Sequence, residues 1–358
     1  MLPARRKART LGEVYRRFGE VDAAETSPLS ARVAVALSES PEALRAVEEA
    51  PARKRHPALI LAVLHDLALA GRAPALAAAH AAGDGDAAAA AAVETLRQRP
   101  DAVGEIAACR RLLTDETGRG AVLSPAVSEA ARRIGARSVG LIDVGRPAGF
   151  NLQVDRVGIT YSNGQSWGDP MSPVQLSPSI VGDRSVPTRA MPDVVTRVLV
   201  DPDALDVTDH DDARWLRACL PPDQMKRAEQ LDAEIELASS APPVLLRDDL
   251  VGVLPEAIAS VPSKALPVVT TTWALSRLSP EKRLRFVQRL TDAAADRTVA
   301  WVSAEGVGVA PTVPTLGDRP ASGHSIVGLT VIDPSGRRSE AVGRCWSRGR
   351  MLAWLAGS

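Results

Sequence analysis

The apolar positions of the chain follow two different spacings, which divide the sequence near residue 134. Over residues 1–134, apolar residues recur at helical intervals and hardly any stretch alternates as a strand does. This spacing predicts helices over residues 11–18, 30–37, 41–48, 57–70 and 87–97. Ser40 before Pro41 marks one helix start, because serine caps a helix and proline suits its first position. We therefore expect an N-terminal helical domain over residues 1–134.

From residue 137 onward, short runs rich in β-branched residues alternate with amphipathic segments. The runs predict strands over residues 138–144, 197–200, 243–246, 267–271 and 298–303. The segments between them predict helices over residues 211–218, 222–238, 254–261 and 280–294. Such alternation is typical of βαβ units. Residues 135–358 are therefore expected to form an α/β, Rossmann-like domain around a mostly parallel sheet.

Two hairpins are predicted within this domain. Asn163-Gly164 is a strong two-residue hairpin signal, and it predicts an inserted hairpin at about residues 153–190. Near the end of the chain, residues 326–332 and 340–346 flank the turn Asp333-Pro-Ser-Gly336. A mostly parallel sheet that ends in an antiparallel hairpin is typical of class I methyltransferases, whereas an ordinary dinucleotide-binding domain ends differently.

Composition excludes several classes of function. The 43 basic and 43 acidic residues cancel, so no net charge attracts the chain to nucleic acid or to a membrane surface. Aromatic residues make up only 3%, which disfavours a stacking surface for single-stranded nucleic acid. Three widely spaced cysteines support neither a disulfide framework nor a zinc site. The most apolar run, residues 57–70, is too short to span a bilayer. We expect a cytoplasmic protein without a metal.

The candidate chemistry begins at the turn after the first predicted strand. That strand carries Asp143 near its end and runs into Gly145-Arg-Pro-Ala-Gly149, after which a short helix is predicted. Glycines let the backbone turn sharply and approach a ligand, and a helix N-terminus offers unpaired N–H groups. Asp143 is placed to accept a hydrogen bond from an amino group. Taken alone, such a turn is weak evidence for a ligand site.

Polar residues at three further strand ends strengthen this interpretation. Asp201 ends the second strand, where an acid binds a ribose diol, and Asp248 and Asp249 follow the third, where an acid takes the exocyclic amine of adenine. Thr272 and Trp273 follow the fourth. Ligands of open α/β sheets bind outside the carboxyl ends of the strands. The alternative is that each aspartate only caps a helix or a turn. Their joint position favours a ligand.

Residues that would act as a base are less well defined. Asp206, Glu305 and His324 are the candidates, and His324, in the predicted loop 306–325, is either a mobile base or a solvated loop histidine. Glu116 and Arg119 precede the first core strand, where a helix would close over a ligand; a structural ion pair or a cap is the alternative.

Seven stretches carry a resemblance to a known family. They are residues 114–119 (TDETGR), 142–151 (IDVGRPAGFN), 205–209 with 214–219 (LDVTD and RWLRAC), 222–224 (PDQ), 271–278 (TTWALSRL) and 349–354 (GRMLAW). The chain resembles an uncharacterised actinobacterial domain-of-unknown-function family with a class I S-adenosylmethionine methyltransferase-like core. The resemblance spans nearly the whole chain from about residue 25.

The resemblance implies a helical N-terminal region packed on a fold that binds S-adenosylmethionine. With this cofactor, the residues predicted to bind it are those of the turn and the strand ends, namely Asp143, Gly145, Gly149, Asn151, Asp201, Asp249, Thr272 and Trp273. The turn departs from the class I pattern at Pro147, where the class favours glycine. Proline fixes φ and has no N–H, so one donor to the ligand is lost there.

The sequence thus predicts an S-adenosylmethionine-dependent methyltransferase that acts on a small molecule. Methyl transfer needs mainly in-line positioning and sometimes one base. The alternative is a non-catalytic ligand-binding or interaction protein on a degenerate methyltransferase fold, which Pro147 and the lack of a clear base favour.

Overall fold

The computed structural model describes residues 9–113, 117–187 and 189–357, and the chain forms two compact units. The first, here called the helical unit, comprises residues 1–114 and 209–232. The second, here called the α/β unit, comprises residues 115–208 and 233–358. The boundary at residues 232 and 233 falls inside one helix, α10 (Met225–Ser239), which therefore contributes to both units.

The helical unit is built from short helices, two of which, α2 and α3, begin at a serine followed by proline. Its helices are α1 (Leu11–Arg17), η1 (Phe18–Asp22), α2 (Pro28–Glu39), α3 (Pro41–Glu48), η2 (Ala52–Lys54), α4 (Pro57–Leu69), α5 (Pro74–Ala82), α6 (Gly85–Gln98), α7 (Pro100–Cys109) and α9 (His210–Ala218). The predicted start at Ser40 is confirmed, because its side chain accepts the N–H of Ala43. Among the described helices none alone is long and apolar enough to span a membrane; α4 and α5 reach that limit only as a pair bent by 102°.

Two histidine rings meet edge to face inside the helical unit. The rings of His65 on α4 and His80 on α5 lie 5.3 Å apart at 84°, and His65 Nδ1 donates to the carbonyl of Leu220 at 3.0 Å. Burial lowers the pKa of both, and the neighbouring His65 lowers that of His80 further, to about 4, although Asp223 opposes this. The folded unit therefore favours both rings in the neutral form.

This pair predicts a loss of stability in acid. Because the folded-state pKa of His80 lies below the unfolded value of 6.5, its contribution is complete above pH 6.5 and is lost as the pH falls towards 4. We expect about 1 kcal/mol from His80, allowing for solvent screening of a partly buried ring. Amide hydrogen exchange in α4 and α5, followed between pH 7 and pH 4.5, measures this loss of stability. His80→Phe keeps a ring in place but does not titrate, so the stability of this variant should change less with pH. If its stability falls with pH as steeply as that of the wild type, His80 is not the titrating group.

The α/β unit contains a large, mostly parallel sheet with the order β5-β12-β11-β10-β9-β8-β1-β6-β7. Its strands are β1 (Ser138–Val144), β5 (Ser179–Ile180), β6 (Asp193–Val200), β7 (Val244–Leu246), β8 (Leu266–Thr272), β9 (Val299–Gly306), β10 (Ser325–Asp333), β11 (Gly336–Trp346) and β12 (Met351–Trp354). Strands β7, β6, β1, β8 and β9 are parallel neighbours, which confirms the predicted parallel core. The pair β10 and β11 is antiparallel, which confirms the terminal hairpin.

The inserted hairpin is also present, in a small separate sheet of order β3-β2-β4. Strands β2 (Gly158–Thr160) and β3 (Ser166–Gly168) pair antiparallel around the Asn163-Gly164 turn, and β4 (Gln175–Leu176) pairs parallel with β2. The short helix predicted after the glycine turn is η3 (Phe150–Gln153), a 3-10 helix of four residues. Since the turn leads into so short a helix, no α-helix N-terminus supplies N–H groups at this point of the described chain.

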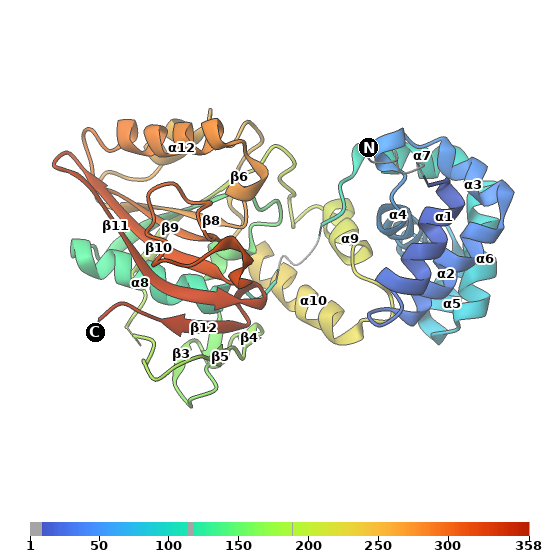
Figure 1. The fold of residues 1–358 in the computed structure, drawn as a ribbon, viewed down its shortest axis with the longest axis horizontal. Helices are drawn as coiled ribbons and strands as arrows, with labels where there is room; N and C mark the ends of the chain where they lie inside the picture. The colour runs from blue at the N-terminus through green and yellow to red at the C-terminus, as the bar shows by residue number, and fades with distance from the viewer. Residues whose placement is uncertain (1–8, 114–116, 188, 358) are drawn as a thin grey trace, which may run out of the picture. The chain divides into compact units, whose positions relative to one another are not determined.

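Helices cover both faces of the large sheet (Figure 1). On one face α8 (Gly120–Ile134) packs against the side chains of Val139 and Leu141 of β1. On the other face α11 (Leu254–Ala259) and α12 (Pro280–Ala293) pack against Ile142 and Val144. Consecutive residues of β1 therefore point into opposite hydrophobic cores, as expected of a strand buried on both sides.

The five parallel strands fix where a ligand site is expected. Numbered by their order along the chain, β1, β6, β7, β8 and β9 lie in the spatial order 3-2-1-4-5, so the direction of winding reverses between β1 and β8. In doubly wound sheets ligands bind outside the carboxyl ends of the strands at this reversal. The carboxyl ends of β1 and β8 carry Asp143 and Thr272, two of the predicted residues.

Candidate functional site

A buried polar cluster lies at the carboxyl ends of β1 and β8. Asp143 is fully buried and accepts a hydrogen bond from Thr270 Oγ1 at 2.8 Å. Asn151 Nδ2 lies 3.1 Å from both carboxylate oxygens of Asp143 and 3.1 Å from Thr272 Oγ1. Inside a protein such a connected network orders its members, because each unmatched polar group would be costly. The structure thus brings together Asp143, Asn151 and Thr272, three of the residues predicted from the sequence.

Arg119 and Trp273 extend this cluster. The guanidinium of Arg119, which is 2% exposed, donates to Thr272 Oγ1 at 3.2 Å and lies 5.3 Å from the ring centre of Trp273. The indole Nε1 of Trp273 donates to Ser325 Oγ at 2.8 Å. Trp273 has φ of 51°, a left-handed conformation that is strained for a residue with a large side chain. An anionic and a cationic side chain therefore share one buried network at the reversal of winding. Glu116, the other predicted member of this region, lies outside the described residues.

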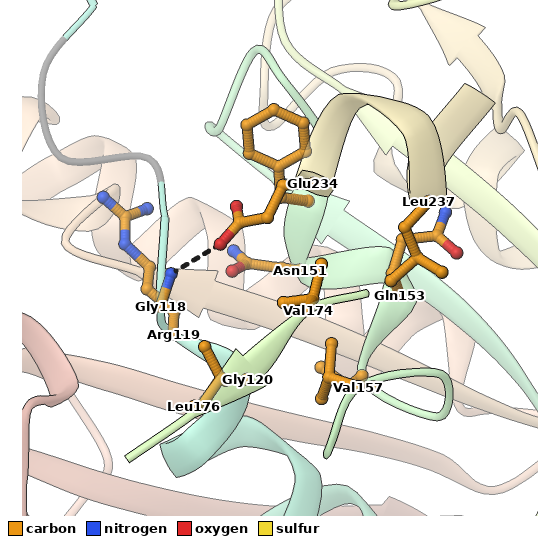
Figure 2. Close-up of a pocket in the computed structure, with 12 residues that line it drawn as sticks. Gly118, Arg119, Gly120, Asn151, Gln153, Val157, Val174, Leu176, Glu234 and Leu237 are labelled. Carbon is orange, nitrogen blue, oxygen red and sulfur yellow. Dashed lines mark hydrogen bonds between the residues drawn. The ribbon is translucent and has the colours of Figure 1, made fainter. Parts of the chain in front are cut away.

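A small pocket adjoins the cluster (Figure 2). Its polar lining includes Arg119, Asn151, Gln153 and Glu234, and one carboxylate oxygen of Glu234 accepts the N–H of Gly118 at 3.2 Å. The rest of the wall consists of Gly118, Gly120 and the apolar side chains of Phe150, Val154, Val157, Val174, Leu176 and Leu237. The pocket encloses about 340 Å³, including space open to solvent, and its interior has room for about one water molecule.

The glycine turn after β1 is covered by protein. Gly145 has φ of 79°, and a Cβ added to it would lie 2.7 Å from Ala274 Cβ and 3.0 Å from Arg277 Nη2. Arg277 Nη2 also donates to the carbonyl of Gly145 and lies 3.7 Å from Asp201 Oδ2. Gly149, with φ of 66°, packs against Leu199. The glycines thus allow close approach as predicted, but the group that approaches is the segment after β8.

Glu305 is the predicted base with the most unusual environment. It lies at the end of β9, is fully buried, and its Oε1 accepts the N–H groups of Ala274 at 3.0 Å and Leu275 at 3.1 Å. Burial raises the pKa of Glu305 to about 7, although these two N–H groups, Thr271 and the charge of Arg283 lower it. Perturbed carboxyls of this kind occur at functional sites and in structural networks alike. Its contacts join it to the segment that covers Gly145.

The other predicted bases make local contacts. Asp206 Oδ1 accepts from the N–H and hydroxyl of Thr208 at 2.9 and 2.6 Å, as in a capped turn. His324 Nε2 pairs with Asp318 at 2.9 Å, and Asp318 also binds Arg344 at 2.7 Å. These contacts are typical of structural roles. Among the described residues, no group of His, Cys, Asp and Glu has the arrangement of a metal site.

Asp249 lies in a turn on the surface. Its carboxylate accepts the N–H groups of Val251 and Gly252 and pairs with Lys282 at 3.0 Å, and Lys282 holds the pKa of Asp249 below its usual value. Both side chains of this ion pair are about half exposed. These contacts fit the turn-residue alternative that the sequence left open for this aspartate.

We predict that Asp249→Asn changes little. Because an exposed ion pair contributes about 0.5 kcal/mol, the free energy of unfolding should fall by no more than about that amount. Affinity for any ligand of the cluster should stay at the wild-type value, since Asp249 makes no hydrogen bond to the cluster among the described residues. Urea unfolding and isothermal titration measure the two quantities. A tenfold loss of ligand affinity would contradict this prediction and would mean that Asp249 takes part in ligand binding.

Three residues that the sequence did not single out prove important here. Thr270 binds Asp143, Glu234 binds the Gly118 N–H, and Arg277 covers Gly145. Thr270 was detectable in principle, because alternate residues of a strand face the same side. Arg277 was not, since it reaches a residue 132 positions away in the sequence.

Comparison with known proteins gives one match. A family model described as "Uncharacterized protein conserved in bacteria (DUF2332)" matches residues 12–354, nearly the whole chain. No curated protein and no solved structure matches it.

Proposed function

This chain belongs to the DUF2332 family, and we propose that it is an S-adenosylmethionine-dependent methyltransferase acting on a small molecule, on a class I methyltransferase-like core. The strand order 3-2-1-4-5 followed by an antiparallel pair supports such a core. The substrate is proposed to be small because the pocket beside the cluster, walled mainly by aliphatic side chains, has room for about one water molecule and must widen to admit even a small molecule.

The observation that carries the proposal is the buried cluster of Asp143, Asn151, Thr272 and Arg119 at the reversal of winding. A core at this position would be more stable with apolar residues than with a carboxylate and a guanidinium. Both charges are instead kept where a doubly wound sheet binds its ligand. Together they complement a zwitterion, such as the amino-acid end of S-adenosylmethionine.

The residues fit one end of this cofactor and not the other. Asp143 would hold the α-ammonium group, and Arg119 the α-carboxylate. At the adenosine end, Arg277 lies between Gly145 and Asp201, where the position of Asp201 at a strand end predicts the ribose. The cofactor thus fits this site only at its amino-acid end while Arg277 stays in place.

When bound, S-adenosylmethionine would supply an electrophilic methyl group. The chain's own contribution would be to hold the donor through Asp143 and Asn151, and to exclude water by means of the apolar wall formed by Val157, Val174 and Leu237. Holding two reactants in line accounts for a large part of such a rate acceleration. Thr272 would keep Arg119 and Asn151 in position, because its hydroxyl oxygen accepts from both.

Titration of the full-length protein tests the proposal. We expect S-adenosylmethionine and S-adenosylhomocysteine to give heat in isothermal titration and to raise the melting temperature. No heat and no shift at millimolar concentrations of either would refute it. Methionine and adenosine, titrated separately, report which end is held, and we expect methionine to bind better.

A matched pair of variants ties the binding to the cluster. Thr272→Val removes the hydroxyl shared by Asn151 and Arg119, and should weaken S-adenosylmethionine binding at least tenfold. Thr330→Val makes the same change at a buried position on β10, where the hydroxyl pairs with Ser339 Oγ at 2.9 Å. Equal losses in the two variants would mean that the effect passes through stability and not through the ligand.

A second function, a non-catalytic ligand-binding protein on a degenerate fold, is favoured by the covered glycine turn. Ala274 and Arg277 fill the space next to Gly145, and the candidate bases Asp206 and His324 are engaged in local contacts. Binding of S-adenosylmethionine without transfer to any acceptor in a screen of small amines, alcohols and thiols would support this function.

A further inference from the structure

The segment that follows β8 covers the predicted ligand site and is held there by a few specific contacts. Within residues 273–278, here called the lid, Ala274 and Leu275 are buried, whereas Ser276 and Arg277 are exposed. The lid therefore has an inner side that packs on the sheet and an outer side in contact with solvent. Its central part is η4 (Leu275–Arg277), a single 3-10 turn.

We propose that this lid is an autoinhibitory element, in which Arg277 occupies a ligand subsite formed by Gly145 and Asp201 until the lid opens. The proposal rests on the function proposed above, since it concerns the same site. It explains why the residues fit the amino-acid end of S-adenosylmethionine and exclude its adenosine end.

The subsite that Arg277 occupies consists of acceptors. The Arg277 guanidinium donates to the Gly145 carbonyl and lies 3.7 Å from the Asp201 carboxylate. A carbonyl and a carboxylate at this spot suit any group rich in donors, such as the two hydroxyls of a ribose. Arg277 is a side chain of this kind, 35% exposed and attached to the lid. A ligand hydroxyl pair and Arg277 would therefore compete for the same acceptors.

The first residue of the lid is held in a strained conformation. Trp273 has φ of 51°, which the chain adopts only because its neighbours enforce it. Its indole Nε1 is held by Ser325 Oγ at 2.8 Å, and its ring lies against the Arg119 guanidinium. Strain of this kind is relieved when the segment moves. The closed position is therefore less stable than its hydrogen bonds and packing contacts alone would make it.

Glu305 holds the inner side of the lid. Its Oε1 accepts the N–H groups of Ala274 and Leu275, whereas its Oε2 is buried and has no hydrogen-bond partner among the described residues. A buried acceptor that has no hydrogen-bond partner destabilises the closed position, and a hydrogen bond from water would remove this cost. Opening the lid would hydrate Oε2 and at the same time free the two N–H groups. Each of the two positions would therefore gain hydrogen bonds that the other lacks.

The far end of the lid is tied to α12. Arg283 Nε donates to the carbonyls of Leu275 and Leu278 at 2.9 and 3.1 Å. Opening would therefore also break the contacts of Arg283 with Leu275 and with Ser276, the latter at 3.3 Å, whereas its contact with Leu278 stays in place. The lid is thus expected to turn about Leu278 and not to unfold.

Amide hydrogen exchange tests the lid without any need for activity. In the wild-type protein the amides of Ala274 and Leu275 should be protected. Arg277→Ala removes the side chain that binds Gly145, and we expect exchange at both amides to rise about tenfold. Arg289→Ala is the matched control, because it removes an exposed arginine from α12. At pH 8, where the wild-type carboxyl is mostly charged, Glu305→Gln keeps the shape of the side chain and should also raise exchange, because a neutral amide is the weaker acceptor.

Titration of the same variants with adenosine and with S-adenosylmethionine gives the second result. Arg277→Ala should bind both about tenfold more tightly than the wild type, whereas Arg289→Ala should not. If Arg277→Ala exchanges its lid amides at the wild-type rate, the lid is refuted. If neither ligand binds to any variant while the lid amides of Arg277→Ala exchange faster, the lid stands and the proposed cofactor fails.

Discussion

Replacing Gly145 with alanine is expected to destabilise the α/β unit by about 3 kcal/mol. Two costs add. A residue with a Cβ pays about 1 kcal/mol or more at φ of 79°, and the new Cβ would lie 2.7 Å from Ala274 Cβ, an overlap that typically costs 1–3 kcal/mol. The flexible end of Arg277 can yield to the new atom, but the backbone-fixed Ala274 cannot. Urea unfolding followed by tryptophan fluorescence measures the loss, since only Trp215 of the six tryptophans lies in the helical unit.

The control for this prediction is Gly135→Ala in the same unit. Gly135 ends α8 with φ of 71°, and a Cβ added there would meet no atom within 4 Å. It should pay only the conformational cost of about 1 kcal/mol. Equal losses in the two variants would mean that the contact between Gly145 and Ala274 is loose and that the glycine turn is open to a ligand in solution.

The second large effect concerns Glu305 and the dependence of stability on pH. In the folded protein its pKa is raised to about 7 from an ordinary 4.5, because burial penalises the charged form. The folded protein therefore keeps this proton at pH values where the unfolded chain has released it. The contribution of the protonated carboxyl is complete below pH 4.5 and is lost as the pH rises through 7. The change amounts to about 3 kcal/mol for a shift of this size.

Glu305→Gln isolates this effect, because glutamine has the same shape and does not titrate. The free energy of unfolding of both proteins is measured in urea at pH 5 and at pH 8. Subtracting the change between the two pH values in Glu305→Gln from the change in the wild type cancels the contributions of the other titrating groups. We expect the wild type to lose about 2–3 kcal/mol more than the variant between the two pH values. A difference near zero would place the Glu305 carboxyl in contact with water and would remove the main support for a closed lid.

A protein that keeps an ionisable carboxyl in such a place gives up stability near neutral pH. This cost is understandable if Glu305 serves the opening of the lid, since perturbed groups cluster at functional sites. The pH profile of adenosine binding to the wild type and to Glu305→Gln would show whether titration of Glu305 affects the opening of the lid as well as stability.

Several features of the fold were predictable from local pattern. The sequence pattern predicts β1 with its observed bounds. The turn residues Asn163-Gly164 and Asp333-Pro-Ser-Gly336 predict the two hairpins. These elements depend on side chains that lie close together in the sequence, namely alternating β-branched residues and the glycines that a tight turn requires. The parallel core followed from the alternation of strands and helices. A strand end is also a local feature, so the sequence by itself predicts that Asp143 and Thr272 lie at the edge of the sheet.

The tertiary structure alone decided what those strand ends do. Asp201 and Asp249 looked alike in the sequence, yet Asp201 is buried beside Arg277 and Asp249 pairs with Lys282 at the surface. Whether an acid meets a ligand, an arginine or water depends on chain segments far away in sequence. The same holds for the glycine turn, since its sequence permits close approach but does not specify what approaches. Packing, which sums contacts over the whole unit, brought Ala274 and Arg277 there, and no local propensity encodes that outcome.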